Sequence, residues 1–167
     1  LVVLSACGGG GAPSTPSYTI TTSASTGGTI SPTSTTVVSG STATFTITPS
    51  SGYAVDSVTG CSGSLSGSNY ATGPVTAGCS IAANFKALPP TVNANASASD
   101  VKINSPVTLT WSSTYATTCT AGGDWAGSLP SSGSQSVTVS KASASYTVTC
   151  NGAGGAATSS VTVKGWD

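Results

Sequence analysis

Residues 43–49 read Ala43-Thr44-Phe45-Thr46-Ile47-Thr48-Pro49, an alternation of apolar and hydroxyl side chains that ends at a proline. Because successive side chains of a strand point to opposite faces, the three apolar residues share one face. The same alternation recurs in Val107-Thr108-Leu109-Thr110-Trp111 and in Tyr146-Thr147-Val148-Thr149-Cys150. No segment has a helical period, and short runs of strand-forming residues alternate with Gly, Pro, Ser and Asn clusters. The sequence therefore predicts an all-β protein.

Charged residues are scarce in this chain. They make up 5% of its 167 residues, and the net charge is zero; soluble domains typically have about 25%. Lys and Arg contacts to phosphate dominate the affinity of proteins for nucleic acid, so we expect no nucleic-acid partner. Because 37% of the residues are hydrophobic and many of them alternate with Thr or Ser, the composition indicates strands and not disorder.

The acidic residues offer little chemistry. Asp56, Asp100 and Asp124 lie far apart in the chain, which has no Arg, Glu or His. General acid–base catalysis needs a group that titrates near neutrality or two carboxylates in one cleft, and a hydroxyl nucleophile needs a base. A calcium site usually gathers several carboxylates, which argues against one at Asp124. We therefore predict no catalytic residues, no metal and no cofactor, and we predict that the protein is not an enzyme.

The first residues have the pattern of an export signal. Leu1-Val2-Val3-Leu4 is an apolar run, followed by Ser5-Ala6-Cys7 and four glycines. The run is too short to span a bilayer, which takes about 20 residues. Leu4-Ser5-Ala6-Cys7 resembles the bacterial lipobox, which implies that Cys7 is acylated, becomes the N-terminus and anchors the protein to a membrane. The alternative is a truncated signal, or a frayed strand, with a spare thiol.

The lipobox resemblance also implies a location. Gly8 follows the cysteine where an Asp often retains such proteins in the inner membrane, so we expect the outer membrane and the cell surface. Residues 1–17 are then a signal remnant, the lipobox and a flexible tether rich in Gly, Pro and Ser.

The remaining four cysteines are Cys61, Cys79, Cys119 and Cys150, two in each half of the chain. An exported chain matures where disulfides persist, so the simplest pairing joins Cys61 to Cys79 and Cys119 to Cys150. Four cysteines allow three connectivities, and only this one keeps each bridge within one half. Zinc is the competing interpretation, but neither half has a C-x-x-C pair or a His.

A first β domain is predicted over residues 18–87, with a Gly/Ser-rich excursion at 62–78. The pieces that characterise it are Gly27-Gly28-Thr29-Ile30-Ser31-Pro32, Phe45-Thr46-Ile47-Thr48-Pro49, Gly52-Tyr53, Gly60-Cys61-Ser62-Gly63 and the closing strand from Cys79 to Phe85. Through these pieces it resembles the divergent InlB B-repeat family, which implies a β-grasp-type bacterial surface repeat that acts as a spacer and not as a catalyst. Val58 stands where many relatives have a Trp, so no role of that ring carries over.

A second β domain is predicted over residues 91–164, after the boundary Leu88-Pro89-Pro90. Its characteristic segments are Leu109-Thr110-Trp111-Ser112-Ser113, Cys119-Thr120-Ala121, Gly133-Ser134-Gln135-Ser136-Val137 and Tyr146-Thr147-Val148-Thr149-Cys150. Through these segments it resembles the bacterial immunoglobulin-like domains, which implies a β-sandwich. Unlike in antibody domains, the core Trp111 precedes both cysteines.

The loop from Ala121 to Gly127 is the best candidate for ligand recognition in the sequence. Trp125 lies among glycines next to Asp124, so the ring can stack on a sugar while the carboxylate accepts hydroxyl hydrogens. The alternative is that Trp125 folds back as a lid over the core. Tyr70, in the excursion of the first domain, is a further candidate ligand contact.

These observations favour a bacterial cell-surface lipoprotein that acts as a structural or adhesive spacer, with a surface glycan or protein as partner. One alternative is a self-assembling extracellular filament, in which Leu1-Val2-Val3-Leu4 is donated as a strand to a neighbour. Another is an accessory carbohydrate-binding region of a larger secreted protein, with Trp125 as its platform.

Overall fold

The computed structural model describes residues 14–167, all of whose regular elements are β-strands. The all-β prediction is confirmed. The expectations for Leu1-Val2-Val3-Leu4, for acylation of Cys7 and for most of the tether lie outside the described residues. Within residues 14–167, no helix is long and apolar enough to cross a membrane.

Contacts divide the chain into two compact units, the second of which contains Phe85–Asp167 together with Thr26–Gly28 and Pro49–Asp56. Strand pairing gives a division at the prolines instead. Strands β1 to β8 pair only among themselves, and so do strands β9 to β16. We call these two sets of strands the first half and the second half.

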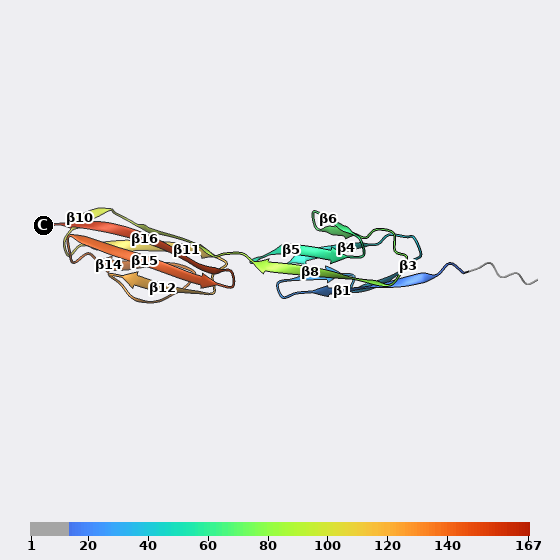
Figure 1. Ribbon diagram of the computed structural model, residues 1–167. Helices are drawn as coiled ribbons and strands as arrows, with labels where there is room; N and C mark the ends of the chain where they lie inside the picture. The colour runs from blue at the N-terminus through green and yellow to red at the C-terminus, as the bar shows by residue number, and fades with distance from the viewer. Residues whose placement is uncertain (1–13) are drawn as a thin grey trace, which may run out of the picture. The chain divides into compact units, whose positions relative to one another are not determined.

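The first half has two four-stranded sheets, in the strand orders β3-β1-β8-β5 and β2-β4-β7-β6 (Figure 1). The first and last strands, β1 and β8, pair in parallel at the centre of their sheet, as in a β-grasp sheet. The strands are β1 (Ser17–Ala24), β2 (Gly28–Ser31), β3 (Ser34–Val38), β4 (Thr44–Pro49), β5 (Tyr53–Gly60), β6 (Ser64–Ser66), β7 (Asn69–Ala71) and β8 (Cys79–Ala87).

Alternation in the sequence places the core of the first half. On β4, Phe45 and Ile47 are buried while the threonines beside them are exposed, as the pattern of residues 43–49 predicts. Ile20 of β1 and Ile81 of β8 are also fully buried. The inward-facing residues of both sheets therefore form this core.

Two adjacent glycines, the last residue of the turn before β2 and the first residue of β2, let aromatic rings pack directly on the backbone. A Cβ built at Gly27 would lie 2.2 Å from the Tyr53 ring, and one built at Gly28 would lie 2.3 Å from the Phe85 ring. Gly27 also has a φ of +107°, which L side chains rarely adopt. At both positions the neighbouring aromatic ring leaves no space for a Cβ atom. At Gly27 the backbone conformation also favours glycine.

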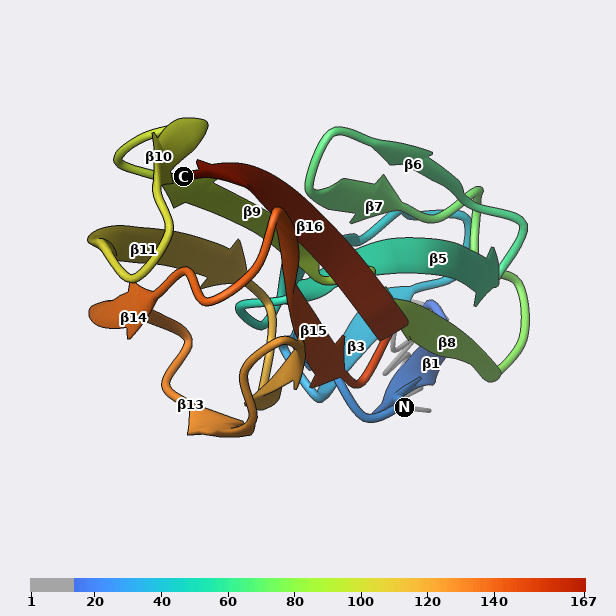
Figure 2. The ribbon, with the colours of Figure 1, turned by 90° about the vertical axis from the view of Figure 1, so that its left-hand side faces the viewer.

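The second half is a sandwich of a three-stranded sheet, β14-β11-β9, and a five-stranded sheet, β10-β16-β15-β12-β13. Figure 2 shows the long strand β16 beside β15. The strands are β9 (Thr91–Ala96), β10 (Asp100–Lys102), β11 (Pro106–Thr114), β12 (Thr118–Gly123), β13 (Gly127–Leu129), β14 (Ser132–Thr138), β15 (Ser143–Gly152) and β16 (Gly155–Trp166).

The core of the second half combines aromatic rings with a disulfide. Trp111, Trp125 and Tyr146 are buried together with both Cys119 and Cys150. The two cysteines lie directly opposite one another on β12 and β15, and they are bonded. The structure also has the bond between Cys61 and Cys79. Each disulfide thus lies within one half, which is the pairing expected from the sequence.

Edges of the sandwich are protected by short strands and by a cross-sheet hydrogen bond. The five-stranded sheet ends on β10 and β13, which have three residues each. On the edge strand β9, the Ala94 N–H donates to the Ser159 hydroxyl of β16 (3.1 Å). The edge strand β14 is longer, and no strand within residues 14–167 pairs with its outer side.

Candidate functional site

Trp125, for which the sequence offered either sugar stacking or a lid over the core, lies in the core of the second half. Its side chain is only 9% exposed. The indole N–H donates to the Thr147 carbonyl (3.1 Å), and the ring packs edge-to-face against Trp111 (centroids 5.5 Å apart) and Tyr146 (6.2 Å). Of the two interpretations of Trp125, the structure therefore has the lid over the core, and the ring is not exposed as a candidate ligand contact.

Asp124 anchors the loop that delivers Trp125 to the core. One carboxylate oxygen accepts from the Lys141 ammonium group (2.6 Å) and the other from the Ser145 N–H (2.7 Å). The Asp124 N–H in turn donates to the Ser145 carbonyl (2.8 Å). The hydrogen bond from Lys141, followed by that from Ser145, lowers the pKa of Asp124 below its ordinary value. Both carboxylate oxygens of Asp124 thus bind groups of the protein itself. Its candidate role as a ligand contact also required an exposed Trp125 ring, and that ring is buried.

The pKa of the neighbouring Tyr146 moves in the opposite direction. Burial raises it above its ordinary value, and the negative charge of Asp124 raises it further. Tyr146 is 2% exposed. Asp124 and Lys141 therefore hold the loop that carries Trp125, and Tyr146 packs against its ring. The raised pKa keeps Tyr146 neutral.

Tyr70, the other expected ligand contact, is also buried. It is 1% exposed and lies opposite Phe45 on the paired strands β7 and β4. Its hydroxyl donates to the Gly60 carbonyl (2.7 Å). This prediction is wrong because the Gly/Ser-rich excursion is not an open loop: it contains β6 and β7, which turn the ring inward.

The Tyr70 hydroxyl instead holds a tight turn at the end of β5. In the turn Gly60-Cys61-Ser62-Gly63, the Gly63 N–H donates to the Gly60 carbonyl (3.1 Å). Cys61 and Ser62 have φ values of 47° and 50°, which makes this a type I′ turn with side chains where glycine or asparagine is usual. The Gly73 N–H adds a bond to the Cys61 carbonyl (3.1 Å). Three hydrogen bonds, donated by the Tyr70 hydroxyl and by the backbone N–H groups of Gly63 and Gly73, thus hold the turn in an unfavourable conformation.

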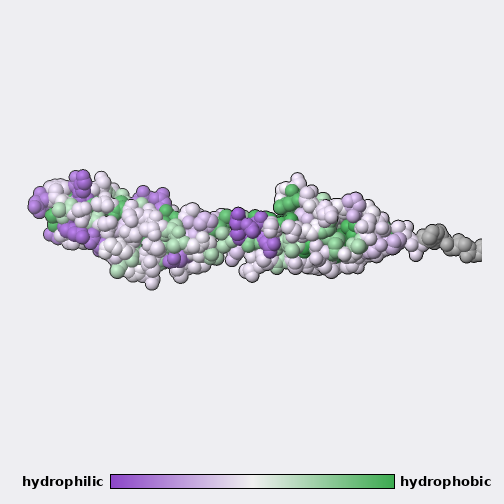
Figure 3. Space-filling view, in the orientation of Figure 1, coloured by the Kyte–Doolittle hydropathy of each residue, from purple (hydrophilic) through white to green (hydrophobic). Residues whose placement is uncertain are grey.

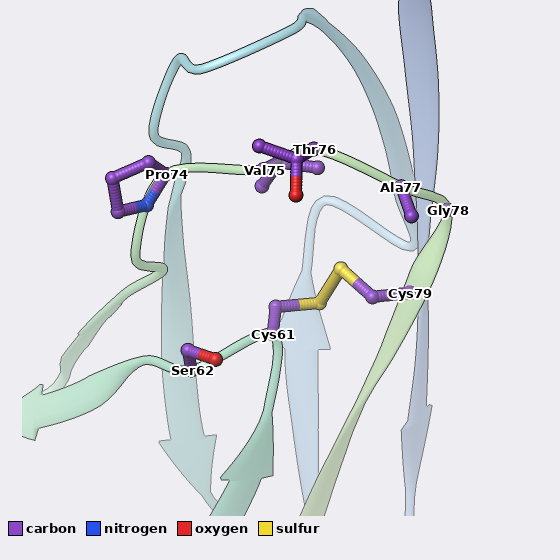
Figure 4. A pocket seen from close by; sticks show the side chains of 8 residues that line it. All are labelled: Cys61, Ser62, Pro74, Val75, Thr76, Ala77, Gly78 and Cys79. Atoms are coloured by element: carbon purple, nitrogen blue, oxygen red, sulfur yellow. A yellow bond between two sulfur atoms is a disulfide. The ribbon is translucent and has the colours of Figure 1, made fainter.

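A hollow of about 180 Å³ lies between this turn and the segment that leads into β8. Figure 4 shows Cys61 and Ser62 on one side, residues 74–79 on the other, and the disulfide between Cys61 and Cys79 joining them. The opposite wall is also fixed, because Val75 exchanges backbone hydrogen bonds with Gly40 and Ser41. The sequence identified the segment Gly60–Gly63 as part of the family resemblance and predicted the disulfide, but it did not predict the turn or the hollow. The hollow depends on hydrogen bonds between Val75 and residues 40 and 41, which are distant in sequence.

The lining of this hollow limits its chemistry. It consists of the disulfide, the hydroxyls of Ser62 and Thr76, small apolar side chains and backbone groups. None of the lining side chains is charged. Such a rigid, uncharged hollow fits a small neutral group and offers no proton donor or acceptor that titrates near neutrality.

The other acids are likewise separated in the structure. Asp56 of β5 forms an exposed ion pair with Lys86 of β8 (3.6 Å), and Asp124 forms the ion pair with Lys141. In the part of the chain that the structure describes, no three His, Cys, Asp or Glu side chains form a group that fits a metal ion.

Comparison with known proteins bears on the first half. Residues 18–89 match the family model of the divergent InlB B-repeat domain, so this segment is similar to that bacterial repeat domain. The match covers β1 to β8 apart from the first residue of β1, and includes the glycine pair, the type I′ turn and the disulfide. No curated protein matches the chain.

Proposed function

We propose that this protein is a structural spacer on the bacterial cell surface. The observation that carries the proposal is the match of residues 18–89 to a bacterial repeat domain. Two disulfides, one in each half, support it, because such bonds persist in exported proteins. Figure 3 adds that residues of near-neutral hydropathy cover most of the face it presents. A surface of hydroxyls with few charges suits a passive connector.

The finer parts of this proposal are an anchor, a location and the class of the second domain. Cys7 carries the lipid, the outer membrane is the location, and the second half is a bacterial immunoglobulin-like sandwich. The protein is not an enzyme and binds no nucleic acid. The anchor and the location rest on the sequence pattern of residues 1–11, and the immunoglobulin-like assignment rests on the motifs within residues 109–150. The exclusion of catalysis and of nucleic acid rests on the scarcity of charge.

A spacer must keep its length under tension, and the disulfides set how far each half can extend. Single-molecule stretching of the oxidised chain should release less contour length than stretching in dithiothreitol. The loops closed by the disulfides span 18 and 31 residues. Reduction should therefore lengthen the two unfolding steps by about 60 Å and about 100 Å respectively. Unfolding at forces too low to resolve would contradict the spacer role.

The anchor is tested separately, by mass spectrometry of the N-terminus of the protein made in a bacterium with its export signal. A mature chain that begins at Cys7 with acyl groups supports the anchor, and a Cys7→Ala variant should then leave the membrane fraction. An unmodified Cys7 would refute it.

A second candidate function, the filament subunit, is favoured by one observation. Strand β14 is a seven-residue sheet edge with no charged residue, and such edges accept an added strand. If the chain assembles in this way, polymers should form with residues 1–6 present, and a Ser134→Pro substitution on β14 should prevent them. Polymers that persist in this variant would exclude β14 as the acceptor.

A further inference from the structure

The two outer faces of the sandwich carry similar side chains but use them differently. On the five-stranded sheet, hydroxyls bond to one another across strands: Thr147 to Ser160 (2.9 Å) and Thr149 to Thr158 (3.2 Å). Part of the hydrogen-bonding capacity of this face is therefore satisfied by hydroxyl groups of the same face.

The outer face of the three-stranded sheet contains a hollow of about 210 Å³, lined by Asn93, Asn95, Thr110, Ser112 and Trp111. Strand register places Asn95 opposite Thr110 and Asn93 opposite Ser112, so two amides and two hydroxyls share one exposed face. Trp111 is 6% exposed, and its ring belongs to the core beneath.

These four polar side chains have almost no partners within residues 14–167. The one hydrogen bond among them is long, from Asn95 Nδ2 to Asn93 Oδ1 (3.5 Å). Each amide has two donor hydrogens and an oxygen with two lone pairs, and each hydroxyl both donates and accepts. Most of the bonding capacity around this hollow therefore remains for a ligand, in contrast to the paired hydroxyls on the opposite face.

We propose that this hollow binds a neutral oligosaccharide. A sugar presents adjacent hydroxyls that both donate and accept, and neighbouring amide and hydroxyl side chains complement such groups. Strand β14 extends the same two rows, with Ser134 beside Thr110 and Ser132 beside Ser112. A chain of several sugar units can thus lie across the three strands.

The charge of this face decides between neutral and anionic sugars. None of the residues that line the hollow is charged, and neither are Ser132 and Ser134 beside it. An anionic sugar would find no cation here to offset the loss of its hydration. Because the side chains are exposed and compete with water, we expect binding of a neutral tetrasaccharide in the millimolar range. This site is separate from Trp125 and does not depend on the spacer role.

The test is an NMR titration of the ¹⁵N-labelled full chain with two neutral probes, a tetrasaccharide of N-acetylglucosamine and maltotetraose, and with the anionic tetragalacturonate. At least one neutral probe should shift the side-chain amide signals of Asn93 and Asn95 and the backbone signals of Thr110 and Ser112. No shift with either neutral probe would overturn the proposal, and so would equal binding of tetragalacturonate.

Two double variants locate the binding. N93A/N95A should weaken the neutral probe at least about tenfold, since two amides are lost. T158A/S160A, which removes exposed hydroxyls from the opposite face, should bind like the parent chain. Unchanged binding in N93A/N95A would overturn the assignment of the site. Backbone spectra of both variants report whether the sandwich is intact, and force measurements on N93A/N95A should remain those of the parent chain even if sugar binding is lost.

Discussion

The two halves contain one disulfide each, but they place it differently. Cys119–Cys150 lies inside an aromatic core, with both cysteines at most 2% exposed. Cys61–Cys79 is half-buried at the rim of a hollow, and Cys61 is itself one of the two residues at positive φ in the turn. The comparison teaches that the same bond is part of the packing in the second half, whereas in the first it holds an unfavourable turn in place.

Trp125→Ala should have the largest effect, because it removes the centre of the aromatic core. We expect a loss of about 4 kcal/mol in the free energy of unfolding of the second half. All three tryptophans lie in this half, so fluorescence excited at 295 nm during urea unfolding reports it selectively. Trp166→Ala is the matched control, since that ring is 54% exposed and should cost little. Equal losses in the two variants would contradict the buried role of Trp125.

Removing the disulfides tests the comparison directly. By loop closure, Cys119→Ala with Cys150→Ala should cost about 4 kcal/mol and Cys61→Ala with Cys79→Ala about 3 kcal/mol. In the intact protein, the half-buried pair should also react first with a mild reductant, because a thiolate must reach the sulfur. Alkylation of the freed cysteines followed by peptide mass spectrometry shows the order in which the two disulfides are reduced. Earlier reduction of Cys119–Cys150 would reverse our assignment of the two roles.

Gly28→Ala tests the close packing of the first half. The new methyl group would overlap the Phe85 ring, and we expect a loss of about 2 kcal/mol. Hydrogen exchange measured by mass spectrometry on peptides from β2 and β8 should show the change. Gly122→Ala is the control, because the nearest atom would lie 3.9 Å from its Cβ. Faster exchange in neither variant would show that Phe85 moves aside freely.

Ser62→Gly should stabilise the first half by about 1 kcal/mol. Glycine adopts the positive φ of this turn position without steric cost, although its freedom in the unfolded chain offsets part of the gain. Thermal unfolding followed by circular dichroism, with the disulfide intact, measures the effect. A lower melting temperature would mean that the Ser62 hydroxyl stabilises the turn.

The smallest effect should come from acid. The pKa of Asp124 is lowered in the folded state, so its contribution to stability is present above its unfolded pKa of about 4 and disappears as the pH falls through the folded value. Melting temperatures at pH 6 and pH 3 should differ more for the parent chain than for Asp124→Asn. Identical pH dependence in the two proteins would show that the Asp124 carboxylate does not stabilise the Trp125 loop.

The alternation of apolar and hydroxyl residues was sufficient to predict much of the fold. It placed Phe45 and Ile47 on the buried face of β4, because a strand's faces follow from its own sequence. The partners of Trp125 and Tyr70 could not be read in this way. Trp125 donates to Thr147, 22 residues away, and Tyr70 to Gly60, 10 residues away. Flanking glycines suggested exposed rings, but they are equally suited to turns that direct rings inward.

Asn93 and Asn95 gave no signal in the sequence for the same reason. Their proposed role depends on Thr110 and Ser112 of the neighbouring strand, and on neither hydroxyl having a hydrogen-bond partner within residues 14–167. A polar residue on a strand is expected at any exposed position, so only strand register distinguishes a hollow from an ordinary face.

The parallel pairing of β1 with β8 has a consequence for the order in which the chain folds during synthesis. Ile20 pairs with Cys79, so the central pair of the sheet joins residues 59 positions apart. Pairings this distant in sequence form slowly, because a long loop must close before they contribute. The first half therefore cannot complete its sheet until the residues of β8 have been synthesised. Until then β1 remains without its parallel partner.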